Sequence, residues 1–273
     1  MNNFLQLCKK KMLRHGIDNA KKEIQWFLEY TTSLSKEKIL FNKAILSEGV
    51  KADLLKFIKR RCNQEPFQYI IESATFFGRD FYVNPSVLIP RPETELIINI
   101  LKSDHKVYHN AMDIGTGSGN LALTLSLEKI AKNIIAIDKS KSALKVAERN
   151  AKKHQTTNVR FININFLQDS IEQQFDLIIS NPPYVSINEY RKLEKQIKYY
   201  EPMEALTDFD DGLLFYKKIS QSLNLTLRDN GVVLLEIGLE KHKAEINQIF
   251  KNYLIKWYKD LNGNYRVIKI KKG

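Results

Sequence analysis

The residues best suited to chemistry form one short run, Ser-Asn-Pro-Pro-Tyr at positions 180–184. They follow residues 175–179, an apolar and β-branched stretch that is typical of a buried strand. The two prolines end this strand, because each fixes φ and lacks an N–H for the next ladder bond. Asn181 is therefore expected at the carboxyl end of a buried strand, where open α/β sheets bind their ligands.

This run predicts a site for a planar NH2 group on an sp2 carbon. The side-chain oxygen of Asn181 and the backbone carbonyl of Pro182 are acceptors for its two hydrogens, and the extended backbone before a proline lets both face one pocket. The ring of Tyr184 would cover the face of the group. The alternative is an ordinary turn, with Asn181 as a turn residue and Tyr184 in the core.

A second candidate region is the glycine loop that follows a short strand at residues 111–114. Its residues are Gly115, Thr116, Gly117, Ser118 and Gly119. Glycines allow a sharp turn and let backbone N–H groups approach a ligand closely. A helix is predicted from Asn120, and its N-terminus favours an anionic group such as a carboxylate or phosphate.

Two further residues lie at the ends of predicted strands. Asp138 ends the strand at 133–138, about as far past the glycine loop as an acid that binds ribose hydroxyls. Its alternative role is the N-cap of the next helix, and we favour the ribose. Phe166 follows the strand at 159–164 and can pack on an adenine ring or in the core.

From residue 110 onward, predicted strands and helices alternate, which indicates an α/β fold with a doubly wound sheet. Asn262-Gly263 lies between strand-like runs at 254–259 and 265–270, so the last two strands are predicted to be an antiparallel hairpin. A nicotinamide-binding loop would follow the pattern G-x-G-x-x-G, whereas this loop is G-x-G-x-G. The pattern looks like the Rossmann-like, S-adenosylmethionine-dependent methyltransferase fold, with a seven-stranded sheet and a terminal antiparallel hairpin.

Three domains are expected. Residues 1–63 are predicted to be a helical bundle, with either a stabilising or a partner-binding role. Its first helix is expected to end at Gly16, and Ser35 is expected to be the N-cap of a later helix. Residues 64–84 are interpreted as a β-hairpin connector turning at 78–80, and residues 85–273 as the catalytic domain. Residues 89–95, which include Pro90-Arg91-Pro92, are interpreted as a stiff start to a helix or a charged lid over a ligand.

Composition sets looser limits. The chain has 273 residues, 43% of them hydrophobic, and a net charge of +12 that weakly favours an anionic partner. Cys8 and Cys62 are far apart, so a disulfide framework or zinc site is not expected. The sequence has no apolar leader and no span long enough to cross a bilayer, so a cytoplasmic location is expected.

Together these residues resemble the peptide chain release factor N5-glutamine methyltransferase family over nearly the whole chain. The markers are Phe67-Gln68-Tyr69-Ile70, Ile89-Pro90-Arg91-Pro92-Glu93-Thr94-Glu95, Asp113-Ile114 with residues 115–119, Asn181-Pro182-Pro183-Tyr184, Glu201-Pro202 with Ala205-Leu206, Asp211-Gly212-Leu213 and Arg266. The Asn-Pro-Pro-Tyr tetrad also occurs in amino-methyltransferases that act on adenine or guanine. Residues 89–95 and the helical N-terminal domain are therefore the specific part.

The resemblance implies a protein-glutamine methyltransferase of translation termination, which methylates the glutamine of the Gly-Gly-Gln motif in peptide chain release factors. It implies S-adenosyl-L-methionine as cofactor, held by residues 115–119, Asp138, Phe166 and Asn181, and substrate contacts from residues 181–184. The family usually has Asp-Trp where this chain has Asn165-Phe166, so a charge and an indole N–H are missing here.

The expected mechanism needs neither a metal nor a general base. Asn181 and Pro182 are the expected catalytic residues, which hold the amide and stabilise positive charge as it develops. A monomer is expected, without stable nucleic acid and without a membrane partner. The alternatives are a ribosomal-protein glutamine methyltransferase, a DNA or RNA amino-methyltransferase, which would need a base-flipping pocket and a basic face, and a non-catalytic binding protein.

Overall fold

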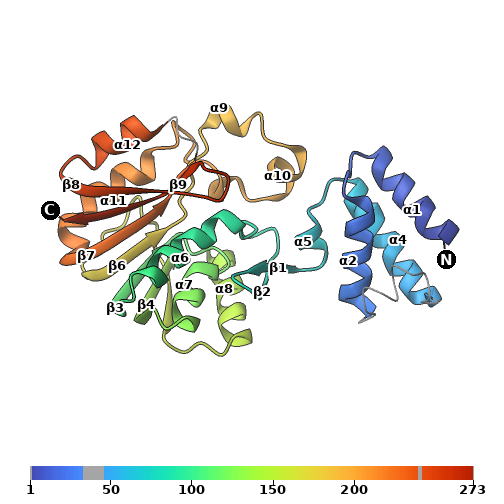
Figure 1. Cartoon of the computed structure of the whole chain (residues 1–273), viewed down its shortest axis with the longest axis horizontal. Helices are drawn as coiled ribbons and strands as arrows, with labels where there is room; N and C mark the ends of the chain where they lie inside the picture. The colour runs from blue at the N-terminus through green and yellow to red at the C-terminus, as the bar shows by residue number, and fades with distance from the viewer. Residues whose placement is uncertain (1, 33–45, 239–241, 273) are drawn as a thin grey trace. The chain divides into compact units, whose positions relative to one another are not determined.

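A computed structural model describes residues 2–32, 46–238 and 242–272. The chain forms two compact units (Figure 1). The first takes in residues 1–73 and 194–200, and the second takes in residues 74–193 and 201–273. No helix among the described residues is long and apolar enough to cross a membrane.

The first unit is a small helical bundle. Its helices are α1 (Asn2–Arg14), α2 (Ala20–Thr32), α4 (Glu48–Cys62), α5 (Phe67–Ile70) and α10 (Lys195–Tyr200). The ring of Phe27 stacks on that of Phe57, with centroids 4.4 Å apart, which joins α2 to α4. Gly16 has φ of 76° just past the end of α1, as expected of a residue that stops a helix. The predicted helix start at Ser35 lies outside the described residues.

The expected hairpin is present, but it is shorter than the sequence suggested. Residues 67–70, which are rich in β-formers, fold as the single turn α5, so their local propensity is overridden. The strands are β1 (Ser73–Phe76) and β2 (Arg79–Tyr82). The turn is Phe77-Gly78, with φ of 50° and 72°, rather than Gly78-Arg79-Asp80. Positive φ at both positions is the geometry of the tight turns that join twisted strands.

The second unit is built around a seven-stranded sheet in the order β5-β4-β3-β6-β7-β9-β8. The strands are β3 (Tyr108–Ile114), β4 (Ala131–Asp138), β5 (Val159–Asn163), β6 (Phe175–Ser180), β7 (Leu227–Glu236), β8 (Tyr253–Lys259) and β9 (Tyr265–Lys272). The first five pair in parallel, whereas β9 pairs antiparallel with both β7 and β8. The predicted sheet and its terminal hairpin are therefore confirmed.

Helices cover both faces of this sheet, because side chains alternate between the faces along each strand. On one face, Ala111 of β3 packs with α6 (Glu95–Ser103), α7 (Asn120–Leu127) and α8 (Lys141–Lys153). On the other, Met112 packs with α11 (Leu214–Thr226) and α12 (Lys243–Ile249). Short helices complete the chain: η1 (Pro92–Thr94), α9 (Ile187–Tyr190) and η2 (Met203–Ala205). Strand ends and helix starts thus meet at one edge of the sheet.

Candidate active site

A cavity lies at the carboxyl ends of β3, β4 and β6. All of its lining residues belong to the second unit, and they come from segments far apart in the sequence. Parallel strands bring these segments together, because their carboxyl ends share one edge of the sheet. Most of the predicted site residues line this cavity; Gly119 and Tyr184 do not.

The glycine loop forms one wall. Residues 115–118 line the cavity directly after β3 ends. Gly115 and Gly117 have φ of 72° and 55°, and a Cβ built on either would meet no atom within 4 Å. These two positions are therefore an open cradle in which backbone can approach a ligand closely. Gly119 instead begins α7 and packs against α8, since its Cβ would lie 3.2 Å from that of Ala147.

Asp138 lies beside this loop at the end of β4. One carboxylate oxygen accepts from Gly117 N–H at 2.9 Å and the other from Ser140 N–H at 2.9 Å. Burial raises the pKa of Asp138, and these hydrogen bonds partly offset the rise. The N-cap of α8 is Ser140, so the alternative role of Asp138 as that cap is wrong. Each carboxylate oxygen retains capacity to accept from a hydroxyl group in the cavity.

A second acid, Asp113, lies close to the glycine loop; from the sequence it was named only as part of the family marker at 113–119. It is buried at the base of the loop, where one oxygen accepts from the Thr116 hydroxyl at 2.7 Å. Within the described residues, its other oxygen has no hydrogen-bond partner. Burial raises the pKa of this carboxyl to about 7. An acid directly before a glycine loop was the signal available in the sequence.

Phe166 forms the wall on the β5 side. It is 6% exposed, packs in the core and also lines the cavity, so its core role is confirmed and its contact with adenine stays a prediction. Its neighbour Asn165 closes the following turn, with its side-chain oxygen accepting from Leu167 N–H at 3.3 Å. The flat ring at this position suits a planar heterocycle.

The tetrad after β6 is divided by the structure. Asn181, Pro182 and Pro183 line the cavity. Tyr184 lies behind them, with its ring against Gly238, where a Cβ would come within 2.9 Å of the ring. Its hydroxyl donates to Glu236 at 3.1 Å. Tyr184 therefore packs against the core behind this wall and does not line the cavity, and its contact with a substrate stays a prediction.

The segment at 89–95 forms another wall and is anchored from a distance. Arg91 donates to Glu201 at 2.5 Å, and Ile89 N–H donates to the other oxygen of Glu201 at 3.2 Å. Pro92 occupies the first turn of η1, as predicted for it. Glu201 belongs to a stretch, residues 201–206, that the sequence offered only as a family marker. The ion pair with Arg91 gives it a physical role, because it joins two loops that border the cavity.

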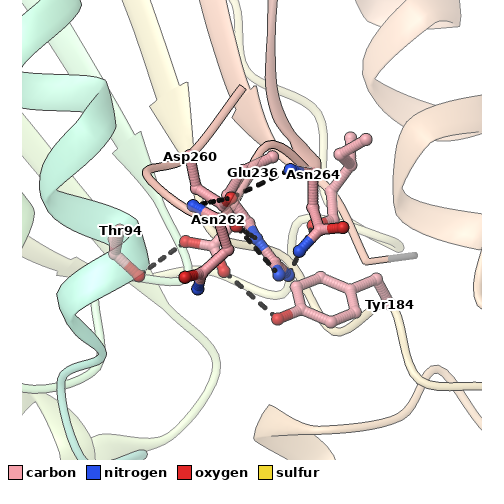
Figure 2. A network of polar contacts seen from close by, with 8 residues as sticks. Thr94, Tyr184, Glu236, Asp260, Asn262 and Asn264 are labelled. Carbon is pink, nitrogen blue, oxygen red and sulfur yellow. Dashed lines mark hydrogen bonds and ion pairs between the residues drawn. The ribbon is translucent and has the colours of Figure 1, made fainter. Parts of the chain in front are cut away.

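Two residues that sequence reasoning missed connect Asn181 to the core. The Asn181 amide nitrogen donates to the Thr94 hydroxyl at 3.1 Å. Thr94 in turn donates to Glu236 at 2.5 Å (Figure 2). Glu236 ends β7 and is 1% exposed. Burial raises its pKa to about 7, partly offset by hydrogen bonds from Thr94 and Tyr184. The available signal was a single acid in the apolar run at 231–237.

Comparison with known proteins covers both units. A family model described as PrmC N-terminal domain matches residues 3–71, and one described as Methyltransferase small domain matches residues 92–198. The release factor glutamine methyltransferase of Bacillus subtilis is 39% identical over 256 residues, or 88% of each chain. That of Buchnera aphidicola is 37% identical, over 98% of this chain and 97% of the relative. A bifunctional methyltransferase of Rickettsia bellii is 34% identical over 99% of this chain but only 54% of its own length.

Solved structures share the fold. A methyltransferase from Pyrococcus furiosus has a TM-score of 0.54 at 21% identity, covering 83% of this chain and 100% of the other. A ribosomal protein L11 methylase from Lactobacillus delbrueckii has a TM-score of 0.51 at 20% identity, covering 70% of this chain and 84% of the other. The sheet order and the antiparallel last strands are thus those of the methyltransferase fold.

Proposed function

Since the chain belongs to the release factor glutamine methyltransferase family, we propose that it methylates the side-chain amide nitrogen (N5) of a glutamine in peptide chain release factors. The cofactor is S-adenosyl-L-methionine. The observation that carries the proposal is the convergence of the glycine loop, Asp138, Phe166 and the Asn-Pro-Pro segment on one cavity.

The residues of the cavity suit this cofactor in shape and chemistry. The open cradle at Gly115 and Gly117 would hold the methionine part, Asp138 would accept from the ribose hydroxyls, and Phe166 would pack on the adenine. When bound, the cofactor supplies a methyl group on an electrophilic sulfonium.

Asn181 and Pro182 are the residues that we propose to hold the substrate amide. An amide nitrogen is a weak nucleophile because its lone pair is delocalised into the carbonyl. Two fixed carbonyl acceptors orient its NH2 group and stabilise the positive charge that develops on nitrogen. Orientation alone is worth roughly 7–11 kcal/mol in well-aligned reactions. No side chain has to remove the proton before the methyl transfer.

The first unit is the proposed docking module for the release factor, since residues 3–71 match a family-specific model while the cofactor cavity lies wholly in the second unit. We also propose that the enzyme acts as a monomer and without stably bound nucleic acid.

The test compares three substrates and two variants. Purified enzyme is incubated with labelled S-adenosyl-L-methionine and a release factor, ribosomal proteins or nucleic acid, and the methylated glutamine is located by mass spectrometry. Label only on a ribosomal protein or only on a polynucleotide would overturn the choice of target.

The variants separate the roles within the site. Asn181→Ala should lower kcat by on the order of 100-fold or more and leave cofactor affinity near that of the wild type, because the lost acceptor acts on the substrate. Asp138→Ala should instead weaken cofactor binding, measured by calorimetry. Equal losses of turnover and cofactor affinity in Asn181→Ala would contradict its proposed role.

A further inference from the structure

The hydrogen bonds behind Asn181 have a direction. An ionised carboxylate only accepts hydrogen bonds, so Glu236 requires a donor at each oxygen. Figure 2 shows Thr94 and Tyr184 reaching its two oxygens from different sides. The Thr94 hydroxyl has one proton, and it is committed to Glu236. Towards Asn181 the hydroxyl therefore presents a lone pair, which accepts only from the amide nitrogen.

This direction decides what Asn181 offers to the cavity. With its nitrogen turned to Thr94, the carbonyl oxygen of the same amide points the other way. No other side-chain hydrogen bond of Asn181 is recorded within the described residues, so its oxygen is available to accept. The two ends of an amide have nearly the same shape, and packing alone does not distinguish them.

We infer that Thr94 and Glu236 are positioning residues that fix the amide of Asn181 with its oxygen facing the substrate. The inference rests on the proposed function, since it assumes that Asn181 accepts from the NH2 group of the substrate glutamine. It adds to that function an explanation of why the site accepts a substrate group that donates hydrogen bonds, such as NH2. Glu236 lies behind the cavity wall and contacts no ligand itself, because it is 1% exposed.

The two hydrogen bonds that run from Asn181 to Thr94 and from Thr94 to Glu236 form a relay. The negative charge on Glu236 keeps this relay in its present direction. The titratable and charged groups that act on it are Tyr184, Arg266 on β9 and Glu93 on η1, along with the hydrogen bond from Thr94. Arg266 lowers the pKa of Glu236, while burial and Glu93 raise it. Protonation of the oxygen that faces Thr94 would let Glu236 donate, which frees the Thr94 proton for the oxygen of Asn181 and turns the amide round.

Glu236→Gln reproduces that reversed state without changing shape. A phenol hydroxyl is a stronger hydrogen-bond donor than acceptor, so the glutamine oxygen accepts from Tyr184 and its NH2 group faces Thr94. The NH2 group then donates to the Thr94 hydroxyl, and Thr94 donates to the side-chain oxygen of Asn181. Every hydrogen bond of the network survives, but each link between Glu236 and Asn181 runs backwards. Asn181 now presents its NH2 group to the cavity, where it opposes the NH2 group of the substrate.

The experiment measures turnover, cofactor affinity, thermal stability and the pH profile of Glu236→Gln. We expect kcat to fall on the order of 100-fold, as when a single transition-state hydrogen bond is removed, with cofactor affinity and the unfolding midpoint unchanged. The wild-type kcat should rise as the pH passes through about 7, the raised pKa of Glu236, and the variant should lack this step. Glu128→Gln is the matched control with wild-type activity, since Glu128 pairs with Arg79 and Lys102 away from the cavity.

A second pair of variants decides the matter even if Glu236→Gln folds poorly. Thr94→Ser keeps the hydroxyl and should retain turnover, whereas Thr94→Val removes it and should lower kcat more than cofactor affinity. Wild-type kcat in folded Glu236→Gln or in Thr94→Val would overturn the inference. The wild-type enzyme and Asn181→Ala are assayed in parallel. If the proposed function itself is wrong, the wild type will not methylate glutamine, and this result is distinct from the outcomes above.

Discussion

Gly212 offers a sharp test of how the tetrad is held in place. It lies in the loop before α11, with φ of 86°, and a Cβ there would overlap the backbone carbonyl oxygen of Tyr184 and lie 3.0 Å from its carbonyl carbon. Gly212→Ala should therefore push the chain at Tyr184 and shift the neighbouring residues that line the cavity. Gly78→Ala is the matched control: its φ is 72°, but its Cβ would meet nothing within 4 Å.

The magnitudes follow from these two environments. An alanine at positive φ destabilises the folded state by roughly 1–2 kcal/mol. The same change lowers the conformational entropy of the unfolded chain, which offsets about 0.4–1 kcal/mol of that loss. Gly78→Ala should thus lower the free energy of unfolding by at most about 1.6 kcal/mol. Gly212→Ala carries in addition an overpacking cost of about 1–3 kcal/mol, which gives a total loss of about 1–5 kcal/mol.

Urea unfolding of the two variants gives the difference directly, with equal m-values as the sign that the denatured state is unchanged. Turnover adds a second readout, since Gly212→Ala should lower kcat and Gly78→Ala should not. Equal stability losses in the two variants would refute the reasoning, because the clash with Tyr184 would then have no energetic weight.

Two further predictions concern buried charges. Burial raises the folded pKa of Asp113 to about 7 from an unfolded value near 4, so the stability due to its protonated form is complete below about pH 4 and lost as the pH rises through 7. The free energy of unfolding without cofactor should fall by up to about 4 kcal/mol over this range, and Asp113→Asn should remove that part of the slope. In the first unit, Glu23 accepts from Arg61 at 2.7 and 3.0 Å in a buried pair, so Glu23→Ala should cost about 3–5 kcal/mol by leaving Arg61 buried without its partner. Asp53→Ala, which breaks the exposed pair with Lys56, should cost under about 1 kcal/mol in the same urea assay.

The sequence predicted what depends on local pattern. Strand β6 and its end at Asn181 follow from an apolar run and two prolines, and the loop at 115–119 follows from glycine spacing. The secondary structure was predicted wrongly where tertiary contacts, and not local sequence, determine it. Residues 67–70 have strand propensity but fold as a helix that packs on α4, with Phe67 against Phe57.

The relay behind Asn181 could not be predicted from the sequence. Thr94 and Glu236 are 142 positions apart, and only the pairing of β6 with β7 and the placement of η1 bring them together. Nothing in their spacing indicates a contact, and each has an ordinary local role, one in a helix start and one at a strand end. The direction of a hydrogen bond is a property of the assembled network, so it has no signature in sequence.

The strand order has a consequence for biosynthesis. Among the described strands, β9 is the last to be translated, yet it lies between β7 and β8. While residues 265–272 are still inside the ribosome, β7 has a bare edge of polar backbone and β8 has no neighbour at all. The insertion of β9 therefore completes the sheet and at the same time covers the edge of β7, which could otherwise pair with a strand of another chain.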